Sequence, residues 1–432
     1  MQRNWFLGDL LAQLFDRPGQ MRVKGDPRSI TDLCEALLSA EGEVSGFKLV
    51  VTILDRYRSL GDTDKIGFFK YLNEALEIDA DKVADLAAQY AKDRSIEGFK
   101  SLSTAAEPRR QELLRRLNQS NGATQELVAM RVDLLRFVKA HPDLRRTDID
   151  FAHLLRSWFN RGFLVLRQIS WDTPARILDK IVAYEAVHQI SDLEDLRRRL
   201  YPPDRRCFAF FHPSMPDEPL IFVEVALTAD VPGSIDDLLS ERRQPFEAEQ
   251  AEAAVFYSIS NCQKGLAGIS FGNLLIKQVV AELALEAPNI RTYVTLSPIP
   301  GLHRWLTTQC EDADHGHIAQ SILAKTAPPE DLRAMSARYL LVAKRDDGLP
   351  VDPVARFHLG NGAEVHALHA GADSSDNGMT QSGGAMVNYL YDLKHTESQH
   401  EEFATHGAIA ASRSVQTLAS TAFVTLPKDS TA

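Results

Sequence analysis

Ser297 stands where a protein can present a group that does chemistry. It lies in the run Thr295-Leu296-Ser297-Pro298-Ile299-Pro300-Gly301, and two prolines and a glycine prevent this run from continuing as a helix or a strand. The preceding residues predict a helix over 271–287 and a strand over 291–296, so the hydroxyl is expected at a strand end in a stiff turn. A rigid turn can present a reactive or substrate-orienting group; the alternative is a capping serine in an ordinary turn.

A loop with three glycines comes before this helix. Gly265, Gly268 and Gly272 separate a predicted strand over 253–260 from the helix. Such a loop can turn several backbone N–H groups toward one point with a helix N-terminus behind them, which suits a pyrophosphate. The loop has neither the Gly-Lys-Ser/Thr ending of a Walker loop nor a GxGxxG spacing, so a simple tight turn is the alternative.

Two other segments carry side chains that could complete a site. His358 precedes a Gly-Asn-Gly turn and is expected near the end of an element, where an imidazole can exchange protons with a substrate. A lone histidine is, however, more often structural. Tyr389 and Tyr391 would point to one face of a strand, either as half-buried aromatics or as a phenol donor over a site.

Histidines at other positions imitate metal-ligand spacings. They are His315, His317, His366 and His369. The sequence places no third ligand beside either pair. All four are therefore predicted in solvent-facing loop or strand positions, and no metal site is predicted.

The elements that must position these residues fall into two parts. Residues 1–160 predict helices punctuated by Gly, Pro and polar clusters, a bundle used for packing or oligomerisation. Residues 161–432 predict strands and helices in the mixed order of an α+β domain. Residues 370–382 are polar and rich in Gly and Ser and predict a loop, whereas the residues after about 404 predict either a closing strand or a frayed tail.

Bulk composition excludes several classes of protein. The 432 residues, 44% hydrophobic and 25% charged, are ordinary for a soluble globular protein of two or three domains. A net charge of −11 argues against a general binder of nucleic acid or anionic membranes. No apolar run is long enough to span a bilayer, and the first residues read as an amphipathic helix rather than a signal peptide. Four scattered cysteines predict reduced thiols, and the cytoplasm is the predicted compartment.

Taken together, these segments resemble the malonyl-CoA decarboxylase family. The matching segments span most of residues 160–395 in the family's order: Arg205-Arg206-Cys207, Glu218-Pro219-Leu220, Val225-Ala226-Leu227-Thr228, Phe256-Tyr257-Ser258-Ile259-Ser260, the 265–272 loop with Leu275-Ile276-Lys277, Leu296-Ser297-Pro298-Ile299-Pro300-Gly301, Phe357-His358-Leu359 with Asn361-Gly362-Ala363, and Asn388-Tyr389-Leu390-Tyr391. The Leu-Ser-Pro-Ile-Pro-Gly run is highly specific, while the glycine loop alone is not. The resemblance implies a helical domain over 1–160 that forms a homo-oligomer, with a tetramer favoured. Over 161–432 it implies a GNAT-like catalytic domain, of the acetyltransferase fold adapted to decarboxylation.

The resemblance also assigns roles to residues. Its catalytic serine and histidine fall on Ser297 and His358, and a site-lining tyrosine falls on Tyr391. Some family members carry a glutamate where this chain has Ser270, so an acid–base role for that carboxylate is not carried over. The acyl-CoA-binding stretch falls on Ala267, Gly268, Ile269, Ser270, Phe271, Gly272 and Asn273.

The implied reaction converts malonyl-CoA to acetyl-CoA and CO2 through a thioester enolate that is protonated at the α-carbon. It requires no metal or organic cofactor, because the thioester carbonyl accepts the electrons. Fatty acid metabolism is the implied context, and the absence of a C-terminal Ser-Lys-Leu suggests a bacterial-type cytoplasmic enzyme. Two alternatives stay open: a GNAT-type acyltransferase that deprotonates an acceptor amine, and a non-catalytic acyl-CoA sensor.

Overall fold

The computed structural model describes residues 26–40, 43–244, 246–269 and 274–421. The predicted N-terminal amphipathic helix lies outside these residues, and so do Ser270, Phe271, Gly272 and Asn273 of the predicted CoA-binding stretch. The chain divides into two compact units between Leu154 and Leu155. Among the residues described, no helix combines the length and the apolar composition that crossing a bilayer requires.

The first unit is helical, as predicted. Its core includes ring contacts of Phe69 with Tyr57, Phe68 and Phe137, at centroid distances of 5.9 to 6.2 Å. Its helices are α2 (Ile30–Ser39), α3 (Glu43–Ser59), α4 (Asp62–Glu74), α5 (Ala80–Asp93), α6 (Ile96–Ala105), α7 (Arg109–Leu117), α8 (Ala123–Phe137) and α9 (Arg145–Trp158), the last of which crosses the boundary between the units.

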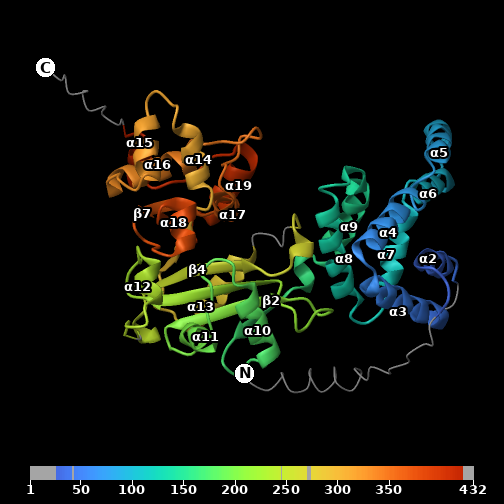
Figure 1. Cartoon of the computed structure of the whole chain (residues 1–432), viewed down its shortest axis with the longest axis horizontal. Helices are drawn as coiled ribbons and strands as arrows, with labels where there is room; N and C mark the ends of the chain where they lie inside the picture. The colour runs from blue at the N-terminus through green and yellow to red at the C-terminus, as the bar shows by residue number, and fades with distance from the viewer. Residues whose placement is uncertain (1–25, 41–42, 245, 270–273, 422–432) are drawn as a thin grey trace. The chain divides into compact units, whose positions relative to one another are not determined.

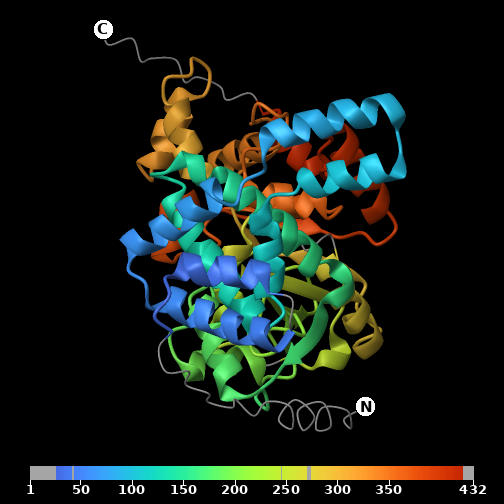
Figure 2. The same cartoon turned by 90° about the vertical axis from the view of Figure 1, so that its right-hand side faces the viewer.

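Helices α5 and α6 form a hairpin that extends beyond the other helices of this unit (Figures 1 and 2). Asp79 and Ser95 cap the two helices by accepting backbone N–H bonds of 3.0 Å, which explains where each helix begins. Neither helix contains a buried residue, and the exposed apolar side chains include Ile96 and Phe99. The hairpin therefore leaves apolar surface uncovered.

The second unit combines one sheet with helices. Its elements are β1 (Val165–Ile169), α10 (Ala175–Tyr184), α11 (Leu193–Leu200), β2 (Arg205–Phe211), β3 (Ile221–Thr228), α12 (Ile235–Leu239), β4 (Ala253–Asn261), α13 (Leu274–Glu286), β5 (Thr292–Thr295), β6 (Ser297–Pro298), α14 (Leu302–Gln309), α15 (Gly316–Leu323), α16 (Pro329–Leu341), α17 (Pro353–Gly360), β7 (Glu364–His369), α18 (Asp376–Ser382), β8 (Met386–Leu390), α19 (Thr396–His406) and α20 (Arg413–Ala419). Strands β1 to β4 are antiparallel neighbours, β5 runs parallel to β4, and β8 pairs antiparallel with β5, β6 and β7.

Alternate side chains of the sheet point to its two faces, and helices bury both of them. On one face Val225 and Phe256 share a core with Val279 and Leu283 of α13. On the other face the strand residues of the core include Phe222, which lies in one cluster with side chains of α10 and α11. The C-terminal helices α14 to α19 gather around β7 (Figure 1). The sheet is thus a buried scaffold that can hold side chains rigidly.

Strands β4 and β5 part within the sheet. Their parallel pairing ends at Phe256 and Thr295, and the backbone N–H of Leu296 still donates to the Phe256 carbonyl at 3.0 Å. Beyond this point β4 continues to Asn261. The segment that follows β5 instead forms β6, which pairs with β8 through Ser297 and Val387. The helical first unit and the mixed sheet of the second confirm the predicted α+β class.

Two predictions about the C-terminal segments were wrong. The predicted loop over 370–382 contains α18, which begins because Ser375 accepts the N–H of Gly378 at 3.1 Å and ends at the left-handed Gly383. Up to Thr421, the segment after 404 has only one parallel bridge, of Ala411 with Val365 of β7, in place of a closing strand, and then forms α20, because Ser412 caps that helix. In both places a serine cap, which suits a turn or a helix start equally, starts a short helix.

Candidate active site

Ser297 lies at the opening between β4 and β5, on the short strand β6. Its side chain is buried, and its hydroxyl donates to the Thr295 hydroxyl at 2.9 Å. Thr295 is itself fixed, because its hydroxyl accepts the N–H of Tyr389 at 3.1 Å and its carbonyl accepts from the Asn388 amide at 2.7 Å. These bonds of Thr295 hold Ser297 in a shielded position. The prediction that the run cannot continue as a strand was wrong at Ser297 and Pro298, which form β6 because they pair with Val387 and Met386.

His358 reaches Ser297 from α17. Helix α17 begins at Pro353 because Asp352 caps it, accepting the N–H of Ala355 at 2.9 Å. His358 lies in its last turn and is 3% exposed. The His358 Nε2 atom is 3.3 Å from Ser297 Oγ, so the structure brings together the two residues predicted to be catalytic.

Two tyrosines hold the imidazole of His358. The hydroxyl of Tyr391 is 2.7 Å from His358 Nδ1, and the ring of Tyr389 stacks on the imidazole with a centroid distance of 4.5 Å and an interplanar angle of 22°. Tyr391 follows directly after β8. The predicted same-face pair of tyrosines therefore forms two walls of one site.

The hydrogen bonds assign the proton of the neutral imidazole. Ser297 has one hydroxyl hydrogen, which it donates to Thr295, so Ser297 Oγ accepts from His358 Nε2–H and Nδ1 accepts from Tyr391. Burial lowers the pKa of His358 to about 3 and raises the pKa of Tyr391 well above its usual value. At neutral pH the site is therefore an uncharged chain of donors that runs from Tyr391 through His358 to Ser297.

The lowered pKa of His358 makes stability depend on pH. The unfolded state protonates His358 below about pH 6.5, while the folded state stays neutral down to about pH 3, so folding stability is lost as the pH falls through this window. When the pH falls from 7.5 to 5.5, His358 should lower the free energy of unfolding by about 1.4 kcal/mol. Denaturant unfolding at both pH values should show a smaller acid loss for His358→Gln than for the unsubstituted protein. An equal loss in both proteins would contradict the buried, neutral imidazole.

Gly301 closes the turn that carries Ser297 and has no room for a side chain. A Cβ atom on Gly301 would overlap the hydroxyl of Tyr339, which is fully buried and packs against Trp305 at a ring distance of 5.3 Å. We expect Gly301→Ala to lower the free energy of unfolding by about 1–3 kcal/mol, measured by denaturant titration. Gly360→Ala is the matched control, because its Cβ would make only an ordinary 3.8 Å contact with Phe403. Equal effects of the two substitutions would contradict this packing.

The predicted CoA-binding stretch follows β4, and the structure describes only its first three residues. Ala267 and Gly268 are exposed and Ile269 is buried. The N–H groups of Ala267 and Ile269 bond to the carbonyls of Lys264 and Leu266 within the loop. Of these three residues, Gly268, with a φ of +74° and open space beside its Cα, offers an N–H with no partner among the described residues.

The sequence prediction missed two polar residues that support the site. Thr295 bonds to Ser297, and the two-residue period of a strand, which places both on one face, is a signal that could have found it. Asp352 starts the helix that carries His358, and an aspartate followed by a proline is a recognised helix start. Both residues act by holding the residues predicted to be catalytic.

Among the described residues, neither pair of histidines with a metal-like spacing comes together in one group of possible metal ligands. Asp312, Asp314 and His315 lie close together on the surface. Asp312 accepts bonds from the backbone N–H groups of Asp314 and His315 and lies 3.0 Å from His315 Nδ1. These contacts organise the turn before α15, and His317 takes no part in them. Local turn formation therefore accounts for the group.

A buried hydroxyl–imidazole–phenol chain, set where two parallel strands part beyond a strand–loop–helix segment, is typical of an enzyme site in an α+β domain. Two family models match the chain: the malonyl-CoA decarboxylase C-terminal domain over residues 162–428 and the malonyl-CoA decarboxylase N-terminal domain over residues 76–159. The chain therefore belongs to the malonyl-CoA decarboxylase family.

Individual relatives agree with this assignment. The mitochondrial malonyl-CoA decarboxylase of Mus musculus is 34% identical over 358 residues, which cover 73% of this chain and 72% of that protein. The crystal structure of the malonyl-CoA decarboxylase of Rhodopseudomonas palustris has 49% identity and a TM-score of 0.85, covering 90% of this chain and 98% of the other. The one from Agrobacterium vitis has 47% identity, a TM-score of 0.85 and coverages of 90% and 99%. The predicted family and enzyme class, a carboxy-lyase, are confirmed.

Proposed function

We propose that this enzyme decarboxylates malonyl-CoA at the opening between β4 and β5, with Ser297 and His358 acting on the malonyl group. The observation that supports this assignment best is the contact of His358 Nε2 with Ser297 Oγ at 3.3 Å, in a position shielded from water. A shielded site strengthens electrostatic interactions with developing charge. The products are acetyl-CoA and CO2.

The reaction breaks the bond between the α-carbon and the carboxylate carbon. The electron pair of that bond enters the π system of the thioester carbonyl, so the bond must stand perpendicular to the carbonyl plane. Negative charge then develops on the thioester oxygen, where a fixed N–H or O–H donor is worth about 10²–10³ in rate. We assign Ser297 to orient the carboxylate or the enolate oxygen, and the loop N–H groups to the thioester end.

His358 supplies the proton that completes the reaction. A positioned acid contributes about 10²–10⁴ in rate. Burial lowers the pKa of His358 to about 3, so the imidazole is neutral at the start. The Nε2–H faces Ser297 and Nδ1 faces the Tyr391 hydroxyl, so the imidazole can give one proton to the α-carbon, directly or through water, while it takes another from Tyr391. The negative charge of the enolate then passes to the Tyr391 oxygen, which takes a proton from solvent before the next turnover.

The CoA moiety is proposed to bind at the start of α13. The assigned residues are Ala267 to Asn273, and the N–H of Gly268, which has no partner among the described residues, supports this assignment. Because a thioester carbonyl is itself the electron acceptor, the proposed reaction needs no metal or organic cofactor. The cytoplasm is the proposed compartment, with which the four free cysteines are compatible.

A homo-oligomer that forms through the helical unit, with a tetramer favoured, is proposed for this enzyme. The α5–α6 hairpin supports this proposal, because it contains no buried residue and exposes Ile96 and Phe99. An isolated pair of helices gains little stability from its own contacts. Light scattering after size exclusion tests the mass of the assembly.

Incubation of the purified enzyme with malonyl-CoA alone tests the function. We expect equal amounts of CO2 and acetyl-CoA without any added acceptor. A GNAT-type acyltransferase would form product only with an acceptor amine, and an acyl-CoA sensor would bind malonyl-CoA without releasing CO2. Either result would overturn the proposal.

A further inference from the structure

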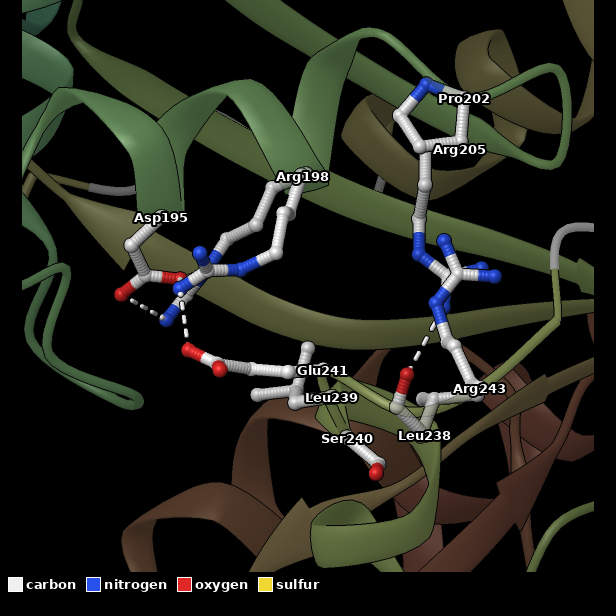
Figure 3. Close-up of a pocket in the computed structure, with 10 residues that line it drawn as sticks. Asp195, Arg198, Pro202, Arg205, Leu238, Leu239, Ser240, Glu241 and Arg243 are labelled. Atoms are coloured by element: carbon white, nitrogen blue, oxygen red, sulfur yellow. Dashed lines mark hydrogen bonds and ion pairs between the residues drawn. The ribbon is translucent and has the colours of Figure 1, made fainter.

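Four arginines line a pocket of about 170 Å³ in the second unit (Figure 3). Arg198 and Arg199 come from α11, Arg205 begins β2, and Arg243 follows α12. The acidic residues of the lining are Asp195 and Glu241. None of these residues belongs to the site of Ser297 and His358.

The arginines differ in how their charge is balanced. The guanidinium group of Arg199 already has several protein partners. It donates to the carbonyls of His188 and Gln189 and to the carboxylates of Asp195 and Glu224. It therefore has a structural role in fixing α11 to the sheet.

Arg205 and Arg243 share one carboxylate. Both guanidinium groups contact Asp204, Arg205 at 3.2 Å and Arg243 through two nitrogens. The remaining bonds of Arg205 go to the carbonyls of Asp204 and Leu238. Two positive groups that face one negative group leave a positive charge that attracts an anion.

Arg198 forms ion pairs with two carboxylates, one of which is on an exposed side chain that can move away. It lies 3.6 Å from Asp195 and 3.1 Å from Glu241, and the Glu241 side chain is 74% exposed. An exposed ion pair of this kind contributes little to stability. An anion that enters the pocket could therefore replace Glu241 as the partner of Arg198 at little cost.

Polar atoms behind the pocket have unused bonding capacity. Glu224 Oε1 and the Tyr257 hydroxyl are fully buried and have no hydrogen-bond partner among the described residues. Burial, together with the charge of Glu185, raises the pKa of Glu224 to about 8, so this carboxyl group is mostly protonated at neutral pH. The cluster then contains four guanidinium groups against the carboxylates of Asp195, Asp204 and Glu241.

The pocket lies far from the proposed CoA loop along β4. Arg205 pairs with Ala226, which pairs with Val255 near the start of β4. The loop follows Asn261, at the other end of the strand. Six residues of strand correspond to about 20 Å.

We propose that this pocket binds a small oxyanion of the size of inorganic phosphate, separately from the acyl-CoA substrate. Guanidinium groups match the oxygens of phosphate in paired, charge-assisted hydrogen bonds. Arg198, Arg205 and Arg243 are the proposed ligands, with Arg199 holding the helix that presents Arg198.

Calorimetric titration of the full-length enzyme with inorganic phosphate tests the site. We expect saturable binding, weakened about tenfold or more by Arg198→Gln and by Arg243→Gln, since a charge-assisted bond is worth about 1.5–3 kcal/mol. Arg197→Gln is the matched control: Arg197 is on the same helix, is 47% exposed and pairs with Glu194, and it lies outside the pocket lining, so binding should not change. Arg198→Lys should restore part of the affinity, which separates loss of the ligand from loss of the fold.

Two results would overturn the proposal. One is the absence of saturable binding at millimolar phosphate, or binding that neither Arg198→Gln nor Arg243→Gln weakens in folded protein. The other comes from repeating the titration with saturating CoA, in which phosphate affinity should stay the same. If CoA displaced phosphate, the pocket would be a subsite for the substrate's own phosphate groups rather than a separate anion site.

Discussion

Replacement of His358 by glutamine is expected to reduce kcat for malonyl-CoA decarboxylation by about 10²–10⁴-fold, because the proton donor is lost. Glutamine keeps a polar group of similar reach between Tyr391 and Ser297, so the loss should fall on kcat, with a small change in KM. Initial rates of CO2 release at several malonyl-CoA concentrations measure both constants.

His366→Gln provides the matched control for this substitution. His366 lies in β7 and is partly exposed, so its replacement should leave kcat within about twofold of the unsubstituted enzyme. Circular dichroism and CoA binding establish that both proteins fold. Wild-type turnover in a folded His358→Gln protein would falsify the assignment of His358 as the proton donor.

Replacement of Ser297 by alanine is expected to reduce kcat by about 10²–10³-fold, the typical effect of removing one preorganised donor. The substitution removes the hydroxyl that bonds to both Thr295 and His358. The imidazole should remain in place, because Tyr391 and Tyr389 still hold it. The measurement is again kcat and KM for malonyl-CoA, together with CoA affinity.

Ser382→Ala separates catalysis from general loss of a buried serine. The Ser382 hydroxyl is also buried, but it bonds to the carbonyls of Gly378 and Ala385 and ends α18. This substitution should lower the free energy of unfolding by about 1 kcal/mol and leave kcat nearly unchanged. If both serine substitutions reduced kcat equally, the effect at Ser297 would be one of stability rather than catalysis.

Local chemistry explains why much of this architecture is readable from the residues alone. Prolines and glycine after Ser297 mark a turn whatever the tertiary fold, and the predicted strands over 253–260 and 291–296 appear as β4 and β5 with nearly the predicted bounds. The loop between β4 and α13 is predicted for the same reason, because its glycines interrupt regular structure.

The meeting of Ser297 with His358 could not be derived from local pattern. It requires β8 to lie between β7 and the β5–β6 edge of the sheet, and this pairing is set by packing over the whole unit. The residues alone marked His358 as a candidate near the end of an element, and the family resemblance supplied its catalytic role. The helix α18 was missed because Gly and Ser favour turns locally, while its Ser375 cap works only when the following residues pack as a helix.

The proposed catalytic chain joins residues that are 61 and 33 positions apart in sequence, His358 to Ser297 and His358 to Tyr391. Contacts between residues so far apart in sequence require closure of the intervening loops. Turnover should therefore report that β6, α17 and the end of β8 have assembled, which a helical content typical of the folded protein does not by itself establish.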